Sequence, residues 1–330
     1  MADSSSLTHL DAAGRARMVD VGEKPLTRRR AVAFGAMWVG TTTLRALLEG
    51  RIAKGDAWAA ARLAGIAGAK KTADLIPLTH PLRLDAVRVH LSAWGAERVV
   101  VFAEAMATDR TGVEMEAMTA ATVALLTLYD MTKAVSRGAR IEEVCLLAKE
   151  GGKSGDWLAE GVERGTIAKL ALSTGKGTPK TPCDEALLVP GFGLEGDAHG
   201  GDWHRQVSLL GVESIRKMQQ MGLKVDFGSF AENVATSGVC LYELPLGSLM
   251  LTSQGAILEV TQIGKECHSR CAVYHTAGDC VMPREGIFIR VRLGSPIRTG
   301  DSLLVKRLPT GYHWTKADLD QRSQDGKNLT

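Results

Sequence analysis

Residues 85–136, DAVRVHLSAWGAERVVVFAEAMATDRTGVEMEAMTAATVALLTLYDMTKAVS, decide the fold of the first half of the chain. Two β-rich runs, residues 85–91 and 97–105, flank a short segment that contains Gly95, and this order predicts an antiparallel hairpin. A long apolar helix is expected directly afterwards, over about residues 117–136.

Working outward, we expect a helix before the hairpin and a strand after the long helix. The earlier helix spans residues 57–72, with Asp56 as its N-cap, and contains Gly65 and Gly68, which would let another element approach closely. The later β-rich run covers residues 141–147. This order predicts an α+β domain of the ferredoxin-like type, an antiparallel sheet with helices on one face.

The second half of the chain has a different pattern. Its β-rich runs are short and broken by Gly and Pro, namely EALLVP, RQVSLL, AILEVTQI, GIFIRVRL and DSLLVKRL, and one helical stretch lies at 212–221. Such runs predict a mainly β, barrel-like domain. We expect a first domain over 1–157, a linker over 158–164, a second domain over 165–307 and a polar tail over 308–330.

Composition limits the class of protein. A chain of 330 residues, 45% of them hydrophobic, can bury two cores. A net charge of +3 does not indicate nucleic-acid binding. The sequence lacks a signal peptide, and it lacks an apolar run long enough to span a bilayer. Six cysteines without a secretion signal indicate reduced thiols, so we expect a cytoplasmic protein without membrane or nucleic-acid partners.

Charged residues of the first half form a candidate catalytic set. Asp130 and Lys133 are spaced i,i+3 on the long helix and therefore share one face. His80 stands in LIPLTHPL between two prolines, and Lys54 precedes the helix at 57–72. Taken singly, a solvated ion pair, a packing histidine and a surface lysine are the more ordinary readings.

The order of these segments resembles the cyclic pyranopterin monophosphate synthase family over about residues 7–157. The matching runs are LTHLDAAGRARMVDVGEKPLTRRRAVA, KGDAWAAARLAGIAGAKKTADLIPLTHPL, TGVEMEAMTAATVALLTLYDM and LLAKEGGKSGDW. The resemblance implies a lyase of molybdenum cofactor biosynthesis that converts (8S)-3′,8-cyclo-7,8-dihydroguanosine 5′-triphosphate to cyclic pyranopterin monophosphate and releases pyrophosphate. It also implies a homo-oligomer, a hexamer, whose active sites form between protomers.

The resemblance also implies roles for single residues. Asp130 corresponds to the active-site acid, Lys133 to its acid/base partner, and Lys54 and His80 to further catalytic participants. Substrate contacts are expected at Leu78, Thr79, His80, Glu114, Met115 and Glu116, the carboxylates orienting the ring or its sugar. Candidates for the triphosphate are Arg28, Arg29, Arg30, Lys70, Lys71, Lys149 and Lys153, although a solvated basic face is an equally good reading for any one of them.

Two expectations complete the first half. Thr79 stands where we expect many relatives to have cysteine, and because threonine keeps a small side chain we expect activity to survive. The synthase half requires no cofactor, with a magnesium ion on the triphosphate as a candidate, and pyridoxal phosphate is not expected.

The segment ECHSRCAVYHTAGDCVMPREGIF brings three cysteines together in the second half. Their spacings, C-x3-C and C-x8-C, are not those of a structural zinc site. This half resembles the MOSC domain, named for the C-terminal domain of molybdenum-cofactor sulfurase, through LEGDAHGGDWHRQVSLL, FAENVATSGV, ELPLGS, EVTQIGKECHSRCAVY and GDCVMPREGIFIRV. The resemblance covers about residues 165–306 and implies a barrel-like domain that handles sulfur or binds molybdenum cofactor.

Site residues of this half follow from that resemblance. Cys271 is the best match to the single cysteine that carries sulfur or binds molybdenum, and Cys267 and Cys280 would assist; three ordinary buried thiols are the alternative. His199, His204 and Arg205, in HGGDWHRQ, are candidates for an anionic pterin phosphate, or else they hydrogen-bond their own loop together with Asp197.

Three functional hypotheses stay open. In the first, the chain is a bifunctional enzyme, with other proteins of the molybdenum cofactor pathway as candidate partners. In the second, the MOSC half is a non-catalytic cofactor carrier. In the third, the first half is a non-catalytic nucleotide-binding relative, and the combination of Lys54, His80, Glu116, Asp130 and Lys133 argues against this, since a binding module needs no acid/base set.

Overall fold

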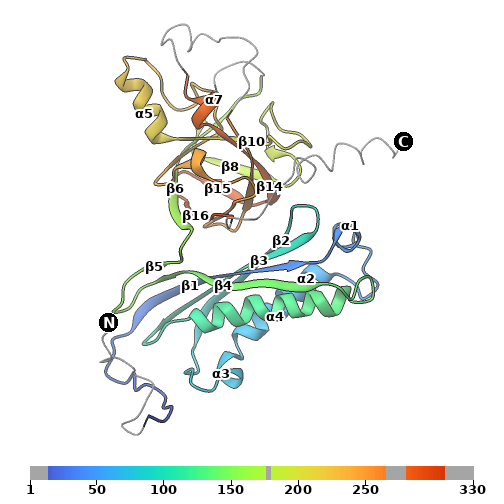
Figure 1. Ribbon diagram of the computed structural model, residues 1–330. Coiled ribbons are helices and arrows are strands. Elements are labelled where there is room, and N and C mark those ends of the chain that lie inside the picture. Colours follow the sequence, from blue (N-terminus) through green and yellow to red (C-terminus); the bar gives the residue numbers. More distant parts are fainter. Residues whose placement is uncertain (1–13, 176–179, 265–279, 309–330) are drawn as a thin grey trace. The chain divides into compact units, whose positions relative to one another are not determined.

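The computed structural model describes residues 14–175, 180–264 and 280–308, which form two compact units (Figure 1). The first unit holds the described residues up to Leu91 and from Arg98 to Ala159. The second holds Ser92–Glu97 and the described residues from Glu160 onward. Among the described residues, no helix is long and apolar enough to cross a membrane.

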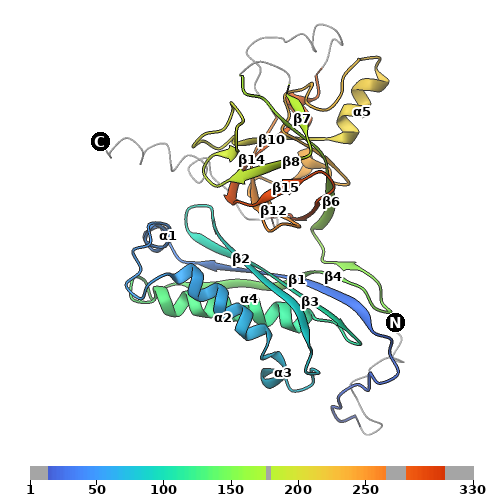
Figure 2. The same cartoon turned by 180° about the vertical axis from the view of Figure 1, so that it is seen from behind.

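The first unit is one antiparallel sheet with helices on one face (Figures 1 and 2). Its strands lie in the order β2-β3-β1-β4-β5, and β1 pairs antiparallel with both β3 and β4. The strands are β1 (Thr27–Trp38), β2 (Leu84–Trp94), β3 (Arg98–Asp109), β4 (Arg140–Glu150) and β5 (Trp157–Leu158), and the helices are α1 (Thr41–Leu48), α2 (Ala57–Ala69), α3 (Thr72–Leu75) and α4 (Glu114–Thr132). The ferredoxin-like prediction is confirmed.

The central strand, β1, was not predicted from the sequence. Its second half, AVAFGAMW, is buried almost throughout, so it lacks the alternation of apolar and polar residues that marks a half-exposed strand. Gly35 lies where β1 passes beneath α4, and a Cβ added there would lie only 2.7 Å from Cδ1 of Leu125. The missing side chain therefore allows the helix to pack directly on the strand.

Helices α2 and α4 pack against each other as the glycines predicted. A Cβ on Gly65 would lie 2.8 Å from the carbonyl oxygen of Ala120, and one on Gly68 would lie 2.8 Å from Cγ2 of Val123. Asp56 caps α2, its side chain accepting from the backbone N–H of Ala59 at 3.0 Å. The start of α4 lies earlier than the sequence analysis predicted, which brings Glu114 and Glu116 into its first turn, where the helix dipole favours acidic groups.

The second unit is a closed β-barrel. Its strands follow the order β11-β10-β14-β13-β12-β16-β6, and β6 also pairs with β11, which closes the barrel. The strands are β6 (Val162–Leu172), β10 (Val207–Gly211), β11 (Val234–Ser237), β12 (Leu249–Thr252), β13 (Ile257–Ile263), β14 (Ile287–Leu293) and β16 (Ser302–Lys306). The predicted barrel-like fold is confirmed, and buried aliphatic residues such as Ile167, Leu209 and Ile289 make up its core.

Smaller elements surround the barrel. Strand β7 (Thr181–Cys183) extends β6, and a second sheet joins β15 (Pro296–Arg298), β8 (Glu185–Val189) and β9 (Gly193–Leu194). Helix α5 (Val212–Gln220) matches the predicted helical stretch, and helix α7 (Met282–Glu285) and the 3-10 turn η2 (Leu241–Glu243) are short.

The predicted linker at 158–164 is shorter in the structure, because strands occupy both of its ends. Leu158 belongs to β5, and β6 begins at Val162, which pairs with Lys306 of β16. The lapse of hydrophobic periodicity indicated a loop here, but β16 pairs with the start of β6 and supplies its hydrogen bonds.

Candidate functional site

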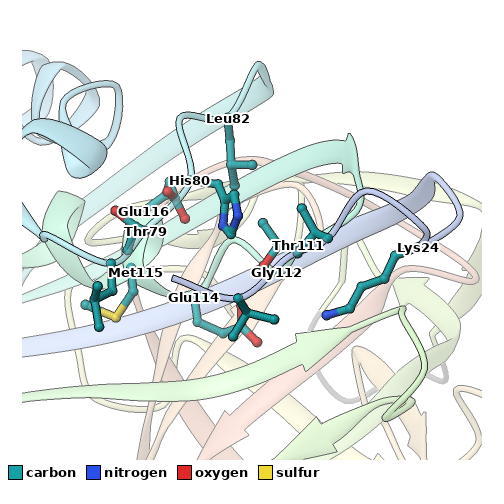
Figure 3. Close-up of a pocket in the computed structure, with 12 residues that line it drawn as sticks. Lys24, Thr79, His80, Leu82, Thr111, Gly112, Glu114, Met115 and Glu116 are labelled. Atoms are coloured by element: carbon teal, nitrogen blue, oxygen red, sulfur yellow. The ribbon is translucent and has the colours of Figure 1, made fainter. Parts of the chain in front are cut away.

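A pocket in the first unit lies at the N-terminal end of α4 (Figure 3). Its volume is about 250 Å³. Its lining includes all six predicted substrate contacts, Leu78, Thr79, His80, Glu114, Met115 and Glu116, together with Val19, Val21, Lys24, Leu82, Thr111 and Gly112. Two segments far apart in the sequence, the loop after α3 and the first turn of α4, therefore form one site.

Glu116 is the buried acid of this pocket, with only 4% of its surface exposed. Its pKa is raised to about 7. Burial is the main cause, a backbone hydrogen bond opposes the shift, and the neighbouring charge of Glu114 adds to it. A carboxyl group with such a pKa can both accept and donate a proton near neutral pH.

Thr79 stands where the sequence analysis expected cysteine in many relatives. Its hydroxyl donates a hydrogen bond to the carbonyl oxygen of Ile76 at 2.9 Å. The side chain thus stabilises its own loop, next to His80 in the pocket wall.

A larger cavity, of about 1040 Å³, adjoins the pocket and shares Lys24, Thr111, Gly112 and Glu114 with it. Six cationic side chains line the cavity against two carboxylates: Lys24, Arg29, Arg30, Arg110, Lys149 and Lys153 against Glu114 and Glu150. Lys149 Nζ lies 3.2 Å from Glu114 Oε1, and Arg30 Nη1 lies 2.6 Å from Glu150 Oε1. We call this space the cationic cavity.

Part of this lining was predicted from the sequence. Arg29, Arg30, Lys149 and Lys153 were candidates for the triphosphate, whereas Lys24 and Arg110 were missed. Both missed residues sit within or beside motifs that carry the family resemblance, GEKPL and TGVEMEAM, and that adjacency was the available signal.

Three predicted phosphate contacts line neither space. Arg28 is exposed on β1, Lys70 is the C-cap of α2, and Lys71 Nζ lies 3.7 Å from Asp74 Oδ2. The lining of the pocket and of the cationic cavity includes none of them.

A glycine turn shapes the wall of the cationic cavity. Gly151 and Gly152 adopt φ values of 85° and 84°, and a Cβ on Gly152 would lie 1.5 Å from Nη1 of Arg29. Arg29 also donates from Nη2 to the carbonyl oxygen of Arg110 at 3.2 Å. The guanidinium group thus occupies the space that a side chain at residue 152 would fill.

The other predicted catalytic residues meet at the opposite end of α4. Lys54 Nζ lies 2.7 Å from Asp130 Oδ2, and Lys133 Nζ lies 2.6 Å from Asp130 Oδ1. The hydrogen bonds from Lys133 and then Lys54 lower the pKa of Asp130 to about 2. Asp130 is therefore a carboxylate at neutral pH, and both lysines donate hydrogen bonds to it.

His80 does not join that cluster. It lies in the pocket with Glu116, and Glu116 and Asp130 are 14 residues apart on one helix. At a rise of ~1.5 Å per residue, that separation is about 21 Å. One copy of the chain therefore holds the predicted catalytic residues in two separate groups.

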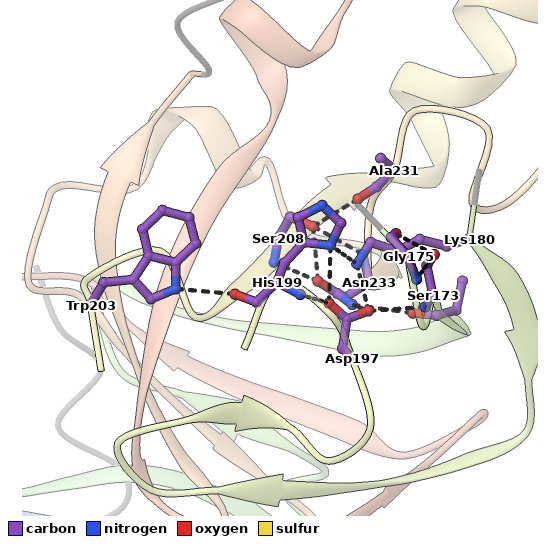
Figure 4. A network of polar contacts seen from close by, with 10 residues as sticks. Ser173, Gly175, Lys180, Asp197, His199, Trp203, Ser208, Ala231 and Asn233 are labelled. Atoms are coloured by element: carbon purple, nitrogen blue, oxygen red, sulfur yellow. Dashed lines mark hydrogen bonds and ion pairs between the residues drawn. The ribbon is translucent and has the colours of Figure 1, made fainter. Parts of the chain in front are cut away.

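The second unit contains a buried polar network around Asp197 (Figure 4). The Asp197 side chain, 1% exposed, accepts from Lys180 Nζ at 2.6 Å and from Asn233 Nδ2 at 2.9 Å. It also accepts from the backbone N–H groups of Ser173 and His199. Burial alone would raise the pKa of Asp197, but these hydrogen bonds, that of Lys180 above all, lower it.

His199 belongs to this network. Its Nδ1 lies 3.2 Å from Asp197 Oδ1 and 3.3 Å from Lys180 Nζ. These contacts match the alternative in which Asp197 and His199 hydrogen-bond their own loop. Lys180 and Asn233 were not predicted.

The remaining candidates of the second unit lie apart. His204 Nε2 lies 2.9 Å from Gln262 Oε1. The Arg205 guanidinium stacks 4.6 Å from the ring centroid of Trp203 and 5.7 Å from that of Phe288. Among the described residues, the buried Nε of Arg205 has no hydrogen-bond partner.

The cysteines can be placed only in part. Cys280 is buried in the apolar cluster beside α5. Cys267 and Cys271 lie outside the described residues. Within the described ranges, no group of three or more His, Cys, Asp or Glu side chains could hold a metal ion.

Comparisons with known proteins identify relatives of the first unit. Residues 18–152 match the MoaC family. Cyclic pyranopterin monophosphate synthase 1 of Mycobacterium tuberculosis is 55% identical over 150 residues, which are 46% of this chain and 88% of that protein. Cyclic pyranopterin monophosphate synthase of Cereibacter sphaeroides is 57% identical over 152 residues, 46% of this chain and 96% of that protein.

Among solved structures, the YuaD protein from Bacillus subtilis aligns with a TM-score of 0.39 and 20% identity, over 45% of this chain and 98% of that one. YiiM from Geobacillus stearothermophilus aligns with a TM-score of 0.35 and 16% identity, over 50% of this chain and 86% of that one.

The ferredoxin-like sheet, the pocket on α4 and these sequence identities define the class. The chain belongs to the MoaC family. More particularly, its first unit is a MoaC-type enzyme domain, which one continuous chain joins to a closed β-barrel.

Proposed function

We propose that the first unit is a lyase of molybdenum cofactor biosynthesis that converts 3′,8-cyclo-7,8-dihydroguanosine triphosphate to cyclic pyranopterin monophosphate and releases pyrophosphate. The observation that carries this function is the cationic cavity, which adjoins the pocket of His80 and Glu116 and shares Glu114 with it. A substrate with a polyanionic chain and a ring rich in N–H and O–H groups needs both kinds of site side by side.

Each part of the substrate has a matching surface. The triphosphate would lie in the cationic cavity, where charged hydrogen bonds from side chains such as Arg29 and Lys153 hold phosphate oxygens. The ring or its sugar would enter the pocket, where Glu114 and Glu116 accept from N–H and O–H groups. Glu116 and His80 would then move protons during ring opening and closure.

The cluster of Lys54, Asp130 and Lys133 can act together with a pocket only if that pocket belongs to a second copy of the chain. It lies about 21 Å along α4 from Glu116, at ~1.5 Å per residue, too far to act on the same reacting atoms within one chain. We therefore propose a homo-oligomer, the hexamer that the family resemblance implies, in which one copy supplies the pocket and its neighbour the lysine–aspartate cluster.

No protein cofactor is needed for these steps. A magnesium ion would arrive on the triphosphate and be held mainly by phosphate oxygens. The carboxylates that line the cationic cavity, Glu114 and Glu150, already accept from Lys149 and Arg30.

Turnover by the purified full chain tests this function. Pyranopterin and pyrophosphate are followed with 3′,8-cyclo-7,8-dihydroguanosine triphosphate as substrate, for wild type, Asp130→Asn and Lys133→Ala. Product from wild type and none from the two variants is expected. Absence of product from correctly folded wild type would overturn the proposal and leave a nucleotide-binding relative.

For the barrel we propose a second function, handling of sulfur or binding of molybdenum cofactor. The supporting observation is Arg205, a cation stacked on Trp203 whose buried Nε lacks a partner among the described residues. Such a group fits an anionic pterin, and the bound cofactor would supply molybdenum chemistry. Cys271, the predicted sulfur or molybdenum ligand, lies outside the described residues. Arg205→Met should abolish pterin binding. If alkylation of Cys271 in the wild-type chain leaves every catalytic activity and pterin binding intact, the barrel is a carrier.

A further inference from the structure

Glu104, on β3, is a buried carboxylate between two arginines. It is 5% exposed. It accepts from Nε of Arg30 at 2.8 Å and also from Nη2 of the same guanidinium. On its other oxygen it accepts from Nη1 of Arg88 at 2.5 Å.

Strand register explains how Arg30 reaches this carboxylate. On β1, Val32 lies opposite Glu104 and Arg30 lies opposite Met106. Arg30 and Glu104 are thus diagonal neighbours on one face of the sheet, within reach of a long side chain. The third contact of the guanidinium, from Nη1 to Glu150 Oε1 at 2.6 Å, is to β4 on the other side.

An apolar residue would suit the position of Glu104 better. Phe102 and Met106, two residues away on either side and on the same face, are 0% and 7% exposed. A charge taken out of water is costly, and a buried ion pair seldom stabilises a fold more than apolar packing does. Stability therefore does not explain why a carboxylate occupies this position.

The reason lies in the cationic cavity. Arg30 lines it and Glu104 does not. Hydrogen bonds from Nε and Nη2 to the same carboxylate oxygen, Glu104 Oε2, fix the orientation of the Arg30 guanidinium group as well as its place. Glu104 can thus act on a ligand in the cavity only through Arg30.

We propose that Glu104 is a positioning residue of the phosphate-binding cavity, holding Arg30 in the orientation that a triphosphate meets. The inference rests on the proposed function, because it takes the cavity to bind a triphosphate. A guanidinium that is already ordered loses less side-chain entropy when the anion binds.

The negative charge of Glu104 also suggests the opposite effect on anion binding. This charge could merely weaken the attraction of the cavity for anions. In that case Glu104→Gln would tighten anion binding, and Glu104→Asp, which keeps the charge, would leave binding unchanged. Positioning predicts that both substitutions weaken binding. Aspartate is one methylene shorter than glutamate, and glutamine has only one acceptor oxygen, so its amide N–H₂ group would face one of the two arginines.

The experiment measures binding and turnover with the full chain. Binding of inorganic triphosphate is followed by calorimetry, and KM and kcat by pyrophosphate release. We expect both Glu104 variants to raise Kd and KM about tenfold and to leave kcat within about twofold. Glu142→Gln is the matched control, because its carboxylate accepts from Nε of Arg98 at 2.7 Å on the same sheet and lines neither space.

Coupling to Arg30 provides the second measurement. Adding Glu104→Gln to Arg30→Lys should change Kd by less than about twofold, since lysine lacks the paired Nε and Nη2 donors through which Glu104 orients Arg30. If Glu104→Gln fails to fold, as judged by circular dichroism, then Glu104→Asp and its coupling to Arg30→Lys decide the question.

Each result has one meaning. An unchanged or lower Kd in the folded variants, or no triphosphate binding by wild type, overturns the inference. If wild type binds triphosphate in a manner that depends on Glu104 but forms no pyranopterin, the proposed function fails and the inference stands.

Discussion

Glu116 and Asp130 stand at opposite ends of α4, separated by about 21 Å at ~1.5 Å per residue. Both belong to conspicuous sites: Glu116 to the pocket beside the cationic cavity, Asp130 to a cluster with two lysines. This separation leads directly to a test of assembly.

The first prediction is complementation between inactive variants. Chains with Glu116→Gln or Asp130→Asn should each be inactive, but co-expression of the two should restore about a quarter of wild-type turnover, because random pairing leaves that share of shared sites intact. Turnover of the co-purified mixture is the measurement. Persistent inactivity of a mixture that forms mixed oligomers would place the whole site within one chain.

The second prediction concerns pH and stability. Burial raises the pKa of Glu116 to about 7 from an ordinary 4.5, so the unfolded chain releases this proton first as pH rises. Its contribution to stability is therefore full below pH 4.5 and is lost between about pH 4.5 and 7, by at most ~3 kcal/mol.

Glu116→Gln should remove this dependence, because glutamine does not titrate. Urea unfolding of wild type and variant at pH 5 and pH 8 gives the comparison. The difference between the two proteins should change with pH; a constant difference would mean that Glu116 titrates at its ordinary pKa.

The third prediction concerns Asp130, whose pKa is held at about 2 by Lys133 first and Lys54 second. Lys133→Ala should return the pKa of Asp130 toward its ordinary value more than Lys54→Ala does. Carbon-13 NMR titration of the side-chain carboxyl measures both changes. Equal values in wild type and in both variants would contradict the hydrogen-bonded cluster.

The fourth prediction concerns the glycine turn. Gly152→Ala should raise KM about tenfold, because the new methyl group would occupy the place of the Arg29 guanidinium. Gly155→Ala is the control: its φ of 66° imposes a similar backbone cost of ~1 kcal/mol, but nothing lies within 4 Å of the added Cβ. Equal KM values for the two variants would rule out a role for the space at residue 152.

The fifth prediction concerns the barrel. Lys180→Met should lower the free energy of unfolding of this unit by about 3–5 kcal/mol, because it leaves Asp197 buried without its cation. Asp197→Leu together with Lys180→Met should cost less than Lys180→Met alone. Denaturant unfolding measures both, and a larger loss in the double variant would show that hydrogen bonds to Ser173 and Asn233, not the charge pair, dominate.

The sequence by itself determined those features whose signal is local. The hairpin of β2 and β3, the cap of α2 at Asp56 and the pairing of Asp130 with Lys133 all depend on residues close in the chain. Short motifs also carried the six substrate contacts, since LTHPL and EME each bring neighbouring residues to one pocket.

Only the tertiary structure decided which distant residues meet. It brought Lys54 to Asp130, assembled the cationic cavity from β1, β4 and the turn before α4, and buried Glu104 and Lys180 against their charged partners. It also made a strand of β1, whose burial on both faces removes the alternation that a sequence reveals. Local periodicity follows from neighbouring residues, whereas these contacts depend on strand order and register, which bring together residues far apart in the chain.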